Sequence, residues 1–170
     1  MNRTFIVNFV GKATPATIKH LAATTHENDG KWLISKVNFI EDQVAAVIKV
    51  ELPKQNEAAV KAEFSSQPDL IVQFADAGQS RHGEETIYQL RLDASDRSGI
   101  VNEITQVLDG QNIQILDMDC QRVFIAGGGG ISSSLFTANI ALRLPKDLLI
   151  KDIAKELESL GEDTRVIVES

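Results

Sequence analysis

Three scarcities in the sequence limit what the chain can be. Cys120 is the only cysteine among 170 residues, which excludes a disulfide framework and a thiolate metal cluster. Aromatic residues make up only 5%, so the core must be built mainly from Ile, Leu and Val. No apolar run approaches the roughly 20 residues that a membrane-spanning helix needs. We therefore expect a cytoplasmic protein with no membrane partner, no bound metal and no cofactor.

Basic charge is also scarce. The 17 Lys and Arg residues are outnumbered by 24 Asp and Glu, which gives a formal net charge of -7 at pH 7, and no basic block stands out. Binding to a nucleic-acid duplex needs a basic footprint that neutralises several phosphates. The sequence argues against direct contact with nucleic acid, so a role in transcription would have to run through another protein.

The second half of the chain has the periodicities of alternating strands and helices. Residues 86–94 alternate apolar and polar side chains, as a half-buried strand does. The apolar residues of the next segment share one helical face, and Gly110 is placed to end that helix. The predicted order is a strand at 86–94, a helix from Ile100 to Leu108, strands at 112–124 and 135–142, a helix opened by Pro145 and closed by Gly161, and a strand at 164–168.

The first half repeats this order at an offset of roughly 83 residues, which indicates an internal duplication. Its predicted elements are a strand at 4–10, a helix at 15–25, strands at 31–40 and 43–52 joined by a tight hairpin, a helix after Pro53 and a strand at 69–74. The order β-α-β-β-α-β is typical of the ferredoxin-like fold, an α+β class with helices on one face of an antiparallel sheet. We expect one domain at 1–75, a linker at 76–85 and a second domain at 86–170.

A short turn separates the first strand of the second domain from its helix, and it reads Asp96-Arg97-Ser98-Gly99. Ser98 or Asp96 can cap the helix, and Gly99 allows close approach of a ligand to the backbone. The N–H groups of a helix start suit a carboxylate, whereas Asp96 suits an ammonium group. The turn therefore favours a small amino acid over a phosphate. A helix cap with no ligand stays open as an alternative.

This turn and its surroundings resemble the ACT domain, a regulatory module of β-α-β-β-α-β fold that commonly binds amino acids. The matching residues are Asp96, Arg97, Ser98, Gly99, Ile100 and Val101, followed by Gly110, Asn112 and Ile113. Two such units filling the chain are similar to the glycine cleavage system transcriptional repressor family.

The resemblance implies a non-catalytic regulator that senses an amino acid, with glycine the metabolite in its circuit, and that docks onto a DNA-binding transcription factor. In ACT domains the ligand lies between two units, near the first turn and the start of the second strand. The ligand-binding residues that it implies here are Asp96, Arg97, Ser98, Gly99, Ile100, Asn112 and Ile113.

The first domain departs from this pattern. Its turn reads Gly11-Lys12-Ala13-Thr14-Pro15-Ala16, so Ala13 stands in place of the acid and Ala16 in place of the glycine. We therefore expect one ligand-competent turn, in the second domain, and a structural or interaction role for the first. The sheet face that the helices leave open would also allow self-association into a homo-oligomer.

Three other functions are alternatives to an amino-acid-binding regulator. An acylphosphatase-type enzyme on the same scaffold would need an anion-binding arginine after the first strand, and Arg97 is the only candidate. No motif such as G-x-S-x-G, H-E-x-x-H or C-x-x-C is present, so we expect no enzyme. An RNA-binding module would need aromatic residues on its central strands. A ligand-independent protein-interaction module is the remaining alternative.

Two further motifs are given structural roles. The run Gly127–Gly130 leads into a strand and lacks the Lys-Ser/Thr pair of a phosphate-binding loop, so it predicts a hairpin connection. Asp117 and Asp119 lie two apart on a strand and are expected on a polar sheet face, with Cys120 packed on the opposite face.

Overall fold

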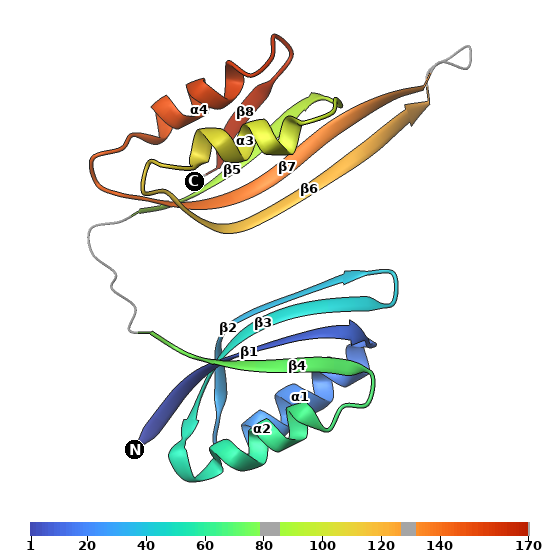
Figure 1. The fold of residues 1–170 in the computed structure, drawn as a ribbon, viewed down its shortest axis with the longest axis vertical. Helices are drawn as coiled ribbons and strands as arrows, with labels where there is room; N and C mark the ends of the chain where they lie inside the picture. Colours follow the sequence, from blue (N-terminus) through green and yellow to red (C-terminus); the bar gives the residue numbers. More distant parts are fainter. Residues whose placement is uncertain (79–85, 127–131, 170) are drawn as a thin grey trace. The chain divides into compact units, whose positions relative to one another are not determined.

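The structure, a computed structural model, describes residues 1–78, 86–126 and 132–169. The chain divides into two compact units, Met1–Ser80 and Arg81–Ser170. Each unit has the order β-α-β-β-α-β, with both helices on one face of a four-stranded antiparallel sheet (Figure 1). The predicted α+β, ferredoxin-like class is confirmed for both units. Among the described residues, no helix is long and apolar enough to cross a bilayer.

The first unit forms one sheet in the strand order β2-β3-β1-β4. The hairpin between β2 and β3 turns at Glu41 and Asp42 as predicted, and Glu41 has a positive φ of 54°. The elements of this unit are β1 (Asn2–Lys12), α1 (Pro15–Glu27), β2 (Lys31–Ile40), β3 (Gln43–Pro53), the 3-10 turn η1 (Lys54–Asn56), α2 (Glu57–Ser65) and β4 (Leu70–Asp76).

The second unit has the equivalent strand order β6-β7-β5-β8. Its strands β6 and β7 are longer than their counterparts in the first unit, and its final strand is short. The elements are β5 (Thr86–Ser95), α3 (Ile100–Leu108), β6 (Gln114–Ala126), β7 (Ser132–Leu144), α4 (Ile150–Glu158) and β8 (Arg165–Glu169).

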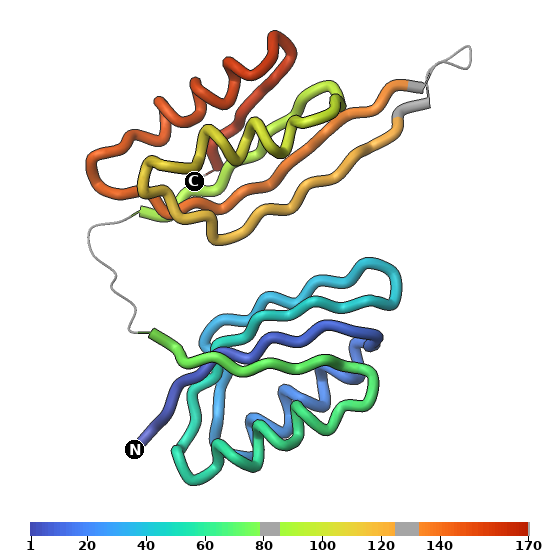
Figure 2. The backbone as a smooth tube through the Cα atoms, viewed as in Figure 1, coloured from blue at the N-terminus to red at the C-terminus, as the bar shows by residue number. Residues whose placement is uncertain are grey.

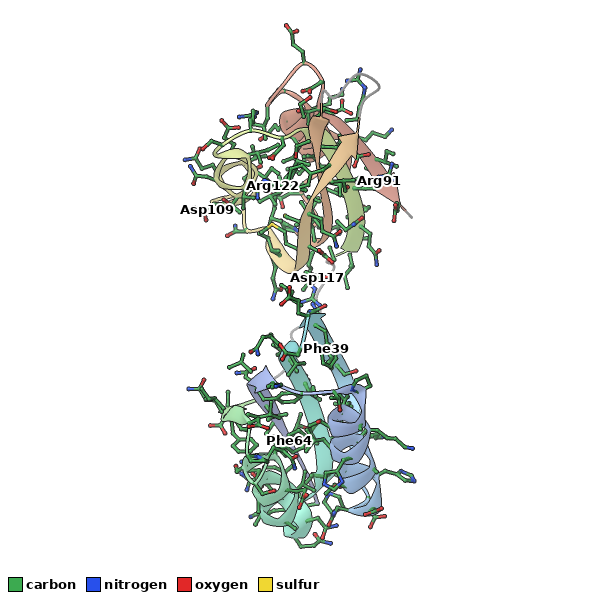
Figure 3. The ribbon with its side chains drawn as sticks, turned by 90° about the vertical axis from the view of Figure 1, so that its right-hand side faces the viewer. Phe39, Phe64, Arg91, Asp109, Asp117 and Arg122 are labelled. Carbon is green, nitrogen blue, oxygen red and sulfur yellow. The ribbon has the colours of Figure 1, made fainter. Side chains whose placement is uncertain are left out.

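Each unit has its own core between the helices and one face of the sheet. In the first unit Phe64 of α2 and Val7 of β1 are completely buried (Figure 3). In the second unit Ile104 of α3 packs with Leu90 and Leu92 of β5. Burying one such side chain stabilises a fold by about 1.5–3 kcal/mol. The strand alternation seen in the sequence thus becomes a buried face and an open face in each sheet.

The prediction that Pro145 opens the last helix was wrong. Pro145 follows directly after β7, and its carbonyl accepts a hydrogen bond from the Leu148 N–H at 3.1 Å, which closes a turn. Helix α4 begins five residues later, at Ile150, and Leu149 before it is 63% exposed. Proline suits either position because it fixes φ and needs no N–H partner. The chain uses it here to leave the sheet before α4 starts.

Strands β6 and β7 continue past the end of β5 (Figure 2). The pairing of β5 with β7 ends at Ser95 and Leu135, whereas the pairing of β6 with β7 continues to Ala126 and Ser132. From Leu135 towards the start of β7, the sheet therefore consists of β6 and β7 alone. The predicted hairpin connection Gly127–Gly130 lies outside the described residues.

The side chains of β6 alternate as predicted. Asp117 and Asp119 are exposed on the open face, whereas Met118 and Cys120 pack against the core on the other. Burial raises the pKa of the Cys120 thiol. Within the described parts of the chain, no group of three or more His, Cys, Asp or Glu side chains is arranged to hold a metal ion.

Candidate functional site

The turn between β5 and α3 is built around a glycine in the left-handed region. Gly99 is the N-cap residue of α3, with φ 83° and ψ 2°. A Cβ atom there would meet nothing within 4 Å, so the requirement for glycine comes from the backbone angle alone. Ser98 and Gly99 are both exposed, whereas Ile100 is 2% exposed and belongs to the core. The start of α3 thus faces solvent on one side and the core on the other.

Neither Ser98 nor Asp96 caps α3, so that prediction was wrong. The side chain of Asp96 turns to the sheet instead. Its carboxylate accepts hydrogen bonds from Arg122 Nε of β6, at 2.9 and 3.0 Å to its two oxygens, and from Ser134 Oγ of β7 at 3.1 Å. The Asp96 N–H also donates to the Ser134 carbonyl at 3.0 Å. Within residues 1–78, 86–126 and 132–169, the first N–H groups of α3 therefore have no side-chain acceptor.

The Arg122 guanidinium holds the pKa of Asp96 below its usual value, with a further contribution from the Ser134 hydroxyl. Asp96 is therefore ionised at neutral pH, and its pair with Arg122 carries no net charge. The Asp96 side chain is 20% exposed and that of Arg122 is 53% exposed. Both charged side chains are therefore partly exposed, at the turn that precedes α3, and are accessible to a small solute.

Arg97 points to other partners. Its guanidinium donates to the Leu160 carbonyl at 3.0 Å and forms an ion pair with Glu103 of α3. This pair raises the pKa of Arg97 and lowers that of Glu103. Arg97 therefore fastens the turn to α3 and to the chain that follows α4. The arginine that an acylphosphatase-type enzyme would need is occupied by an internal acid.

The turn is braced from a second side by the loop between α4 and β8. Asp163 in that loop accepts a hydrogen bond from the Ser95 N–H at 3.0 Å. Hydrogen bonding to Ser95 lowers the pKa of Asp163. Contacts from β6, β7 and the chain that follows α4 thus hold the turn and the end of β5 that leads into it.

Asn112 and Ile113 lie at the opposite end of α3 from this turn. The helix has nine residues, which corresponds to about 13 Å at 1.5 Å per residue. Asn112 is exposed with a positive φ of 56°, and Ile113 packs against the core. The structure brings together the predicted residues from 96 to 100 but not 112 and 113. One small ligand cannot touch both groups within a single unit.

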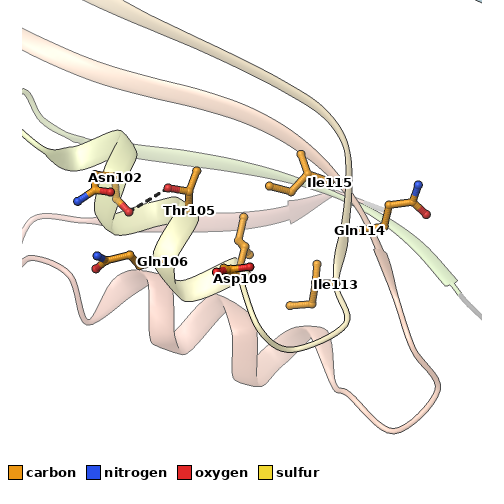
Figure 4. Close-up of a pocket in the computed structure, with 8 residues that line it drawn as sticks. Asn102, Thr105, Gln106, Asp109, Ile113, Gln114 and Ile115 are labelled. Carbon is orange, nitrogen blue, oxygen red and sulfur yellow. Dashed lines mark hydrogen bonds between the residues drawn. The ribbon is translucent and has the colours of Figure 1, made fainter.

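An open groove does lie beside Ile113. Its volume is about 550 Å³, and it runs between the second half of α3 and the start of β6 (Figure 4). The Thr105 hydroxyl, which lines it, already donates within α3, to the Asn102 carbonyl at 3.0 Å. The lining residues are Asn102, Thr105, Gln106, Leu108, Asp109, Ile113, Gln114 and Ile115.

The equivalent turn of the first unit is closed by its own backbone. The Lys12 and Ala13 N–H groups donate to the carbonyls of Asp69, at 3.3 Å, and Asp42, at 3.1 Å. Ala13, at the position of Asp96, is 7% exposed. Helix α1 begins at Pro15, so Ala16 is helical where its counterpart Gly99 is left-handed. This turn offers no acidic group to a ligand.

Arg122 and Ser134 are the site residues that the sequence did not point to. They lie 26 and 38 positions after Asp96 and come from two different strands. A signal did exist, because an arginine follows Met118 and Cys120 in the inward-facing register of β6. To predict from this signal that Arg122 meets Asp96, one must know how β6 and β5 are aligned against β7. Local periodicity does not give that alignment.

Comparison with known proteins identifies structures that share this fold. No family model and no curated protein matches the sequence. A protein from Galdieria sulphuraria, described only as unknown, has a crystal structure with a TM-score of 0.81 at 16% identity, covering 99% of this chain and 98% of that one. A protein provisionally described as a glycine cleavage system transcriptional repressor gives a TM-score of 0.66 at 12% identity, covering 99% of this chain and 97% of that one.

The chain therefore shares the fold of these two structures, with two ferredoxin-like β-α-β-β-α-β units in succession. Its resemblance to glycine cleavage system transcriptional repressors, inferred above from the sequence, is confirmed at the level of the fold.

Proposed function

We propose that this chain is a non-catalytic regulatory protein that binds a small amino acid at the Asp96–Gly99 turn. One observation carries the proposal: an ionised carboxylate paired with a guanidinium lies in a partly exposed turn that leads directly into an uncapped helix start. An ammonium group suits Asp96, and a carboxylate suits the other two groups. A phosphate would meet the same carboxylate as a repulsive charge.

Glycine is the first ligand to test. The structure provisionally described as a glycine cleavage system transcriptional repressor shares the fold over nearly its whole length. Any control by glycine requires that the amino acid bind the free and the partner-bound protein with different affinity. Regulation of an amino-acid catabolic operon would follow from that difference.

The partner we propose is a DNA-binding transcription factor. A net charge of -7 gives this chain no electrostatic attraction to phosphates of its own. The DNA contact is therefore assigned to the partner, and the chain acts by docking onto it. Purified chain added to duplex DNA at low salt should leave its electrophoretic mobility unchanged.

The test is thermal unfolding in the presence of a panel of amino acids that includes glycine and serine. A ligand at 100 times its dissociation constant stabilises the folded protein by about 2.7 kcal/mol, which for a chain of this size raises the midpoint by roughly 5–10 °C. Asp96→Asn keeps the shape of the side chain and removes its charge, so it should abolish the shift. Asp147→Asn, at an exposed position in the turn after β7, is the matched control and should retain it.

The outcomes separate the candidate functions. A shift that Asp96→Asn removes and Asp147→Asn keeps supports an amino-acid sensor. No shift with any amino acid refutes binding and leaves a ligand-independent interaction module. Hydrolysis of an acylphosphate by the purified chain would refute the non-catalytic assignment. We expect no such activity, because the ion pair with Glu103 already engages Arg97.

A further inference from the structure

The ion pair between Asp96 and Arg122 has unused binding capacity. The contacts of Arg122 with both carboxylate oxygens come from Nε alone. A guanidinium carries five N–H donors, and within the described residues its two terminal nitrogens have no hydrogen-bond partner. Arg122 also contacts no acidic group other than Asp96 in those residues. The terminal nitrogens form a planar fork of the kind that binds a carboxylate with two parallel hydrogen bonds.

The position of Arg122 in the sheet is unusual for a charged residue. It pairs in register with Phe136 of β7, which is 1% exposed, and so belongs to the row of β6 that faces the helices. Met118 and Cys120 precede it in that row and pack against the core. Arg122 is the position at which this row leaves the core and contacts Asp96, in the turn before α3. A side chain placed there for packing alone would be apolar.

We propose that Arg122 is a ligand-binding residue that makes the site selective for zwitterions: Arg122 binds the α-carboxylate of the ligand while Asp96 binds its ammonium group. Ser134 is a positioning residue, because its hydroxyl holds the Asp96 carboxylate from the side of β7. This inference rests on the proposed function and extends it to a residue and a ligand class.

The charges of the site decide the selectivity. A simple cation competes with Arg122 for Asp96, and a simple anion competes with Asp96 for Arg122. An α-amino acid presents both charges on one carbon, within about 3.5 Å of each other, and the opposite charges of the site are 2.9 Å apart. The ammonium group of the amino acid pairs with Asp96 and its carboxylate pairs with Arg122. The total charge of the site stays balanced, and neither side chain is left without an ionic partner.

The experiment compares each amino acid with its amide, which keeps the ammonium group and lacks the carboxylate. Affinities for glycine, glycinamide, serine and serinamide are measured by calorimetric titration on the full chain. The unaltered protein should bind glycine or serine at least about tenfold more tightly than the matching amide. In Arg122→Gln that preference should vanish, because the amino acid loses its carboxylate partner while the amide gains an unopposed Asp96.

Three further variants separate binding from folding. Arg122→Lys keeps the charge but not the planar fork, so it should restore part of the preference. Ser134→Ala should weaken the amino acid and its amide alike, because both use Asp96. Arg91→Gln is the matched control, since Arg91 forms a comparable exposed ion pair, with Asp93, on the same sheet. It should leave all four affinities unchanged. For Arg122→Gln and Arg122→Lys the result is the ratio of two affinities within one variant, so a general loss of stability does not imitate it.

The failures are distinguishable. If glycine or serine binds and Arg122→Gln keeps the full preference over the amide, the inference is wrong and the proposed amino-acid site stands. If no amino acid in the panel binds the unaltered chain, the proposed function is wrong, and the assignment of Arg122 falls with it.

Discussion

The closed turn of the first unit depends on Gly11, and replacing this glycine with alanine should be strongly destabilising. Gly11 has φ 147°, and a Cβ atom built on it would lie 2.1 Å from the carbonyl oxygen of Asp69, whereas real Cβ contacts essentially never fall below 3.0 Å. The obstacle is backbone, which cannot rotate away as a flexible side chain can. Strands β1 and β4, which pair Gly11 with Leu70, must therefore separate locally by about 1 Å.

The magnitude follows from two losses. Holding a non-glycine residue in this region costs about 1–3 kcal/mol, and separating the strands removes the Lys12 to Asp69 hydrogen bond, worth about 1 kcal/mol. The unfolded alanine chain has less conformational entropy to lose on folding than the glycine chain, which offsets about 0.4–1 kcal/mol of these losses. We expect a net destabilisation of about 2–3 kcal/mol.

The assay is urea unfolding followed by tryptophan fluorescence. Trp32 is the single tryptophan of the chain and lies on β2 of the first unit, where its indole N–H donates to Thr25 at 3.1 Å. With a slope of about 1–2 kcal/mol per molar urea, Gly11→Ala should lower the midpoint by about 1–3 M. If the slope of the unfolding free energy against urea is unchanged, the lower midpoint reflects lower stability and not a change in the surface exposed on unfolding.

Gly99→Ala is the matched control in the second unit. Its Cβ meets nothing within 4 Å, so only the backbone angle, at φ 83°, is strained, at a cost of about 1 kcal/mol. It should leave the Trp32 transition in place and lower the unfolding midpoint of the second unit, seen by circular dichroism. A Gly11→Ala variant with the tryptophan transition of the unaltered protein would refute the close approach of Asp69.

Three further predictions concern the second unit. Its stability should fall as the pH drops below about 4, because the lowered pKa values of Asp96 and Asp163 stabilise the fold only while both carboxylates are ionised, which acid titration by circular dichroism checks. Ile104→Ala should cost about 2–5 kcal/mol, whereas Val101→Ala, at a 36% exposed position, should cost far less in urea unfolding. Cys120 should react with a thiol reagent more slowly when folded than in urea, because burial raises its pKa.

The periodic parts of the fold could be predicted from local sequence. Apolar residues two apart in 86–94 and three or four apart in the following helix reflect burial against a single core. The internal duplication in the sequence is enough to make the two turns equivalent. The last helix was the exception, because a proline is equally suited to a helix start and to the turn that it forms at Pro145.

The role of Asp96 could not be predicted in the same way. A carboxylate beside a helix start predicts a cap, and the competing partners, Arg122 and Ser134, are far along the chain. A charge-assisted hydrogen bond to arginine is stronger than one to a neutral backbone N–H. The longer-range contact therefore replaced the local one.

The sequence by itself determined the duplicated β-α-β-β-α-β order, the buried faces, and the difference between an acidic turn in one unit and an alanine-containing turn in the other. Those features depend on residue types and on spacings of a few positions. Only the tertiary structure decided that Arg122 meets Asp96, that Asp69 closes the turn at Gly11, and that Asn112 lies a helix length away from the site. Each of these depends on strand register or on helix direction, which place residues distant in sequence side by side.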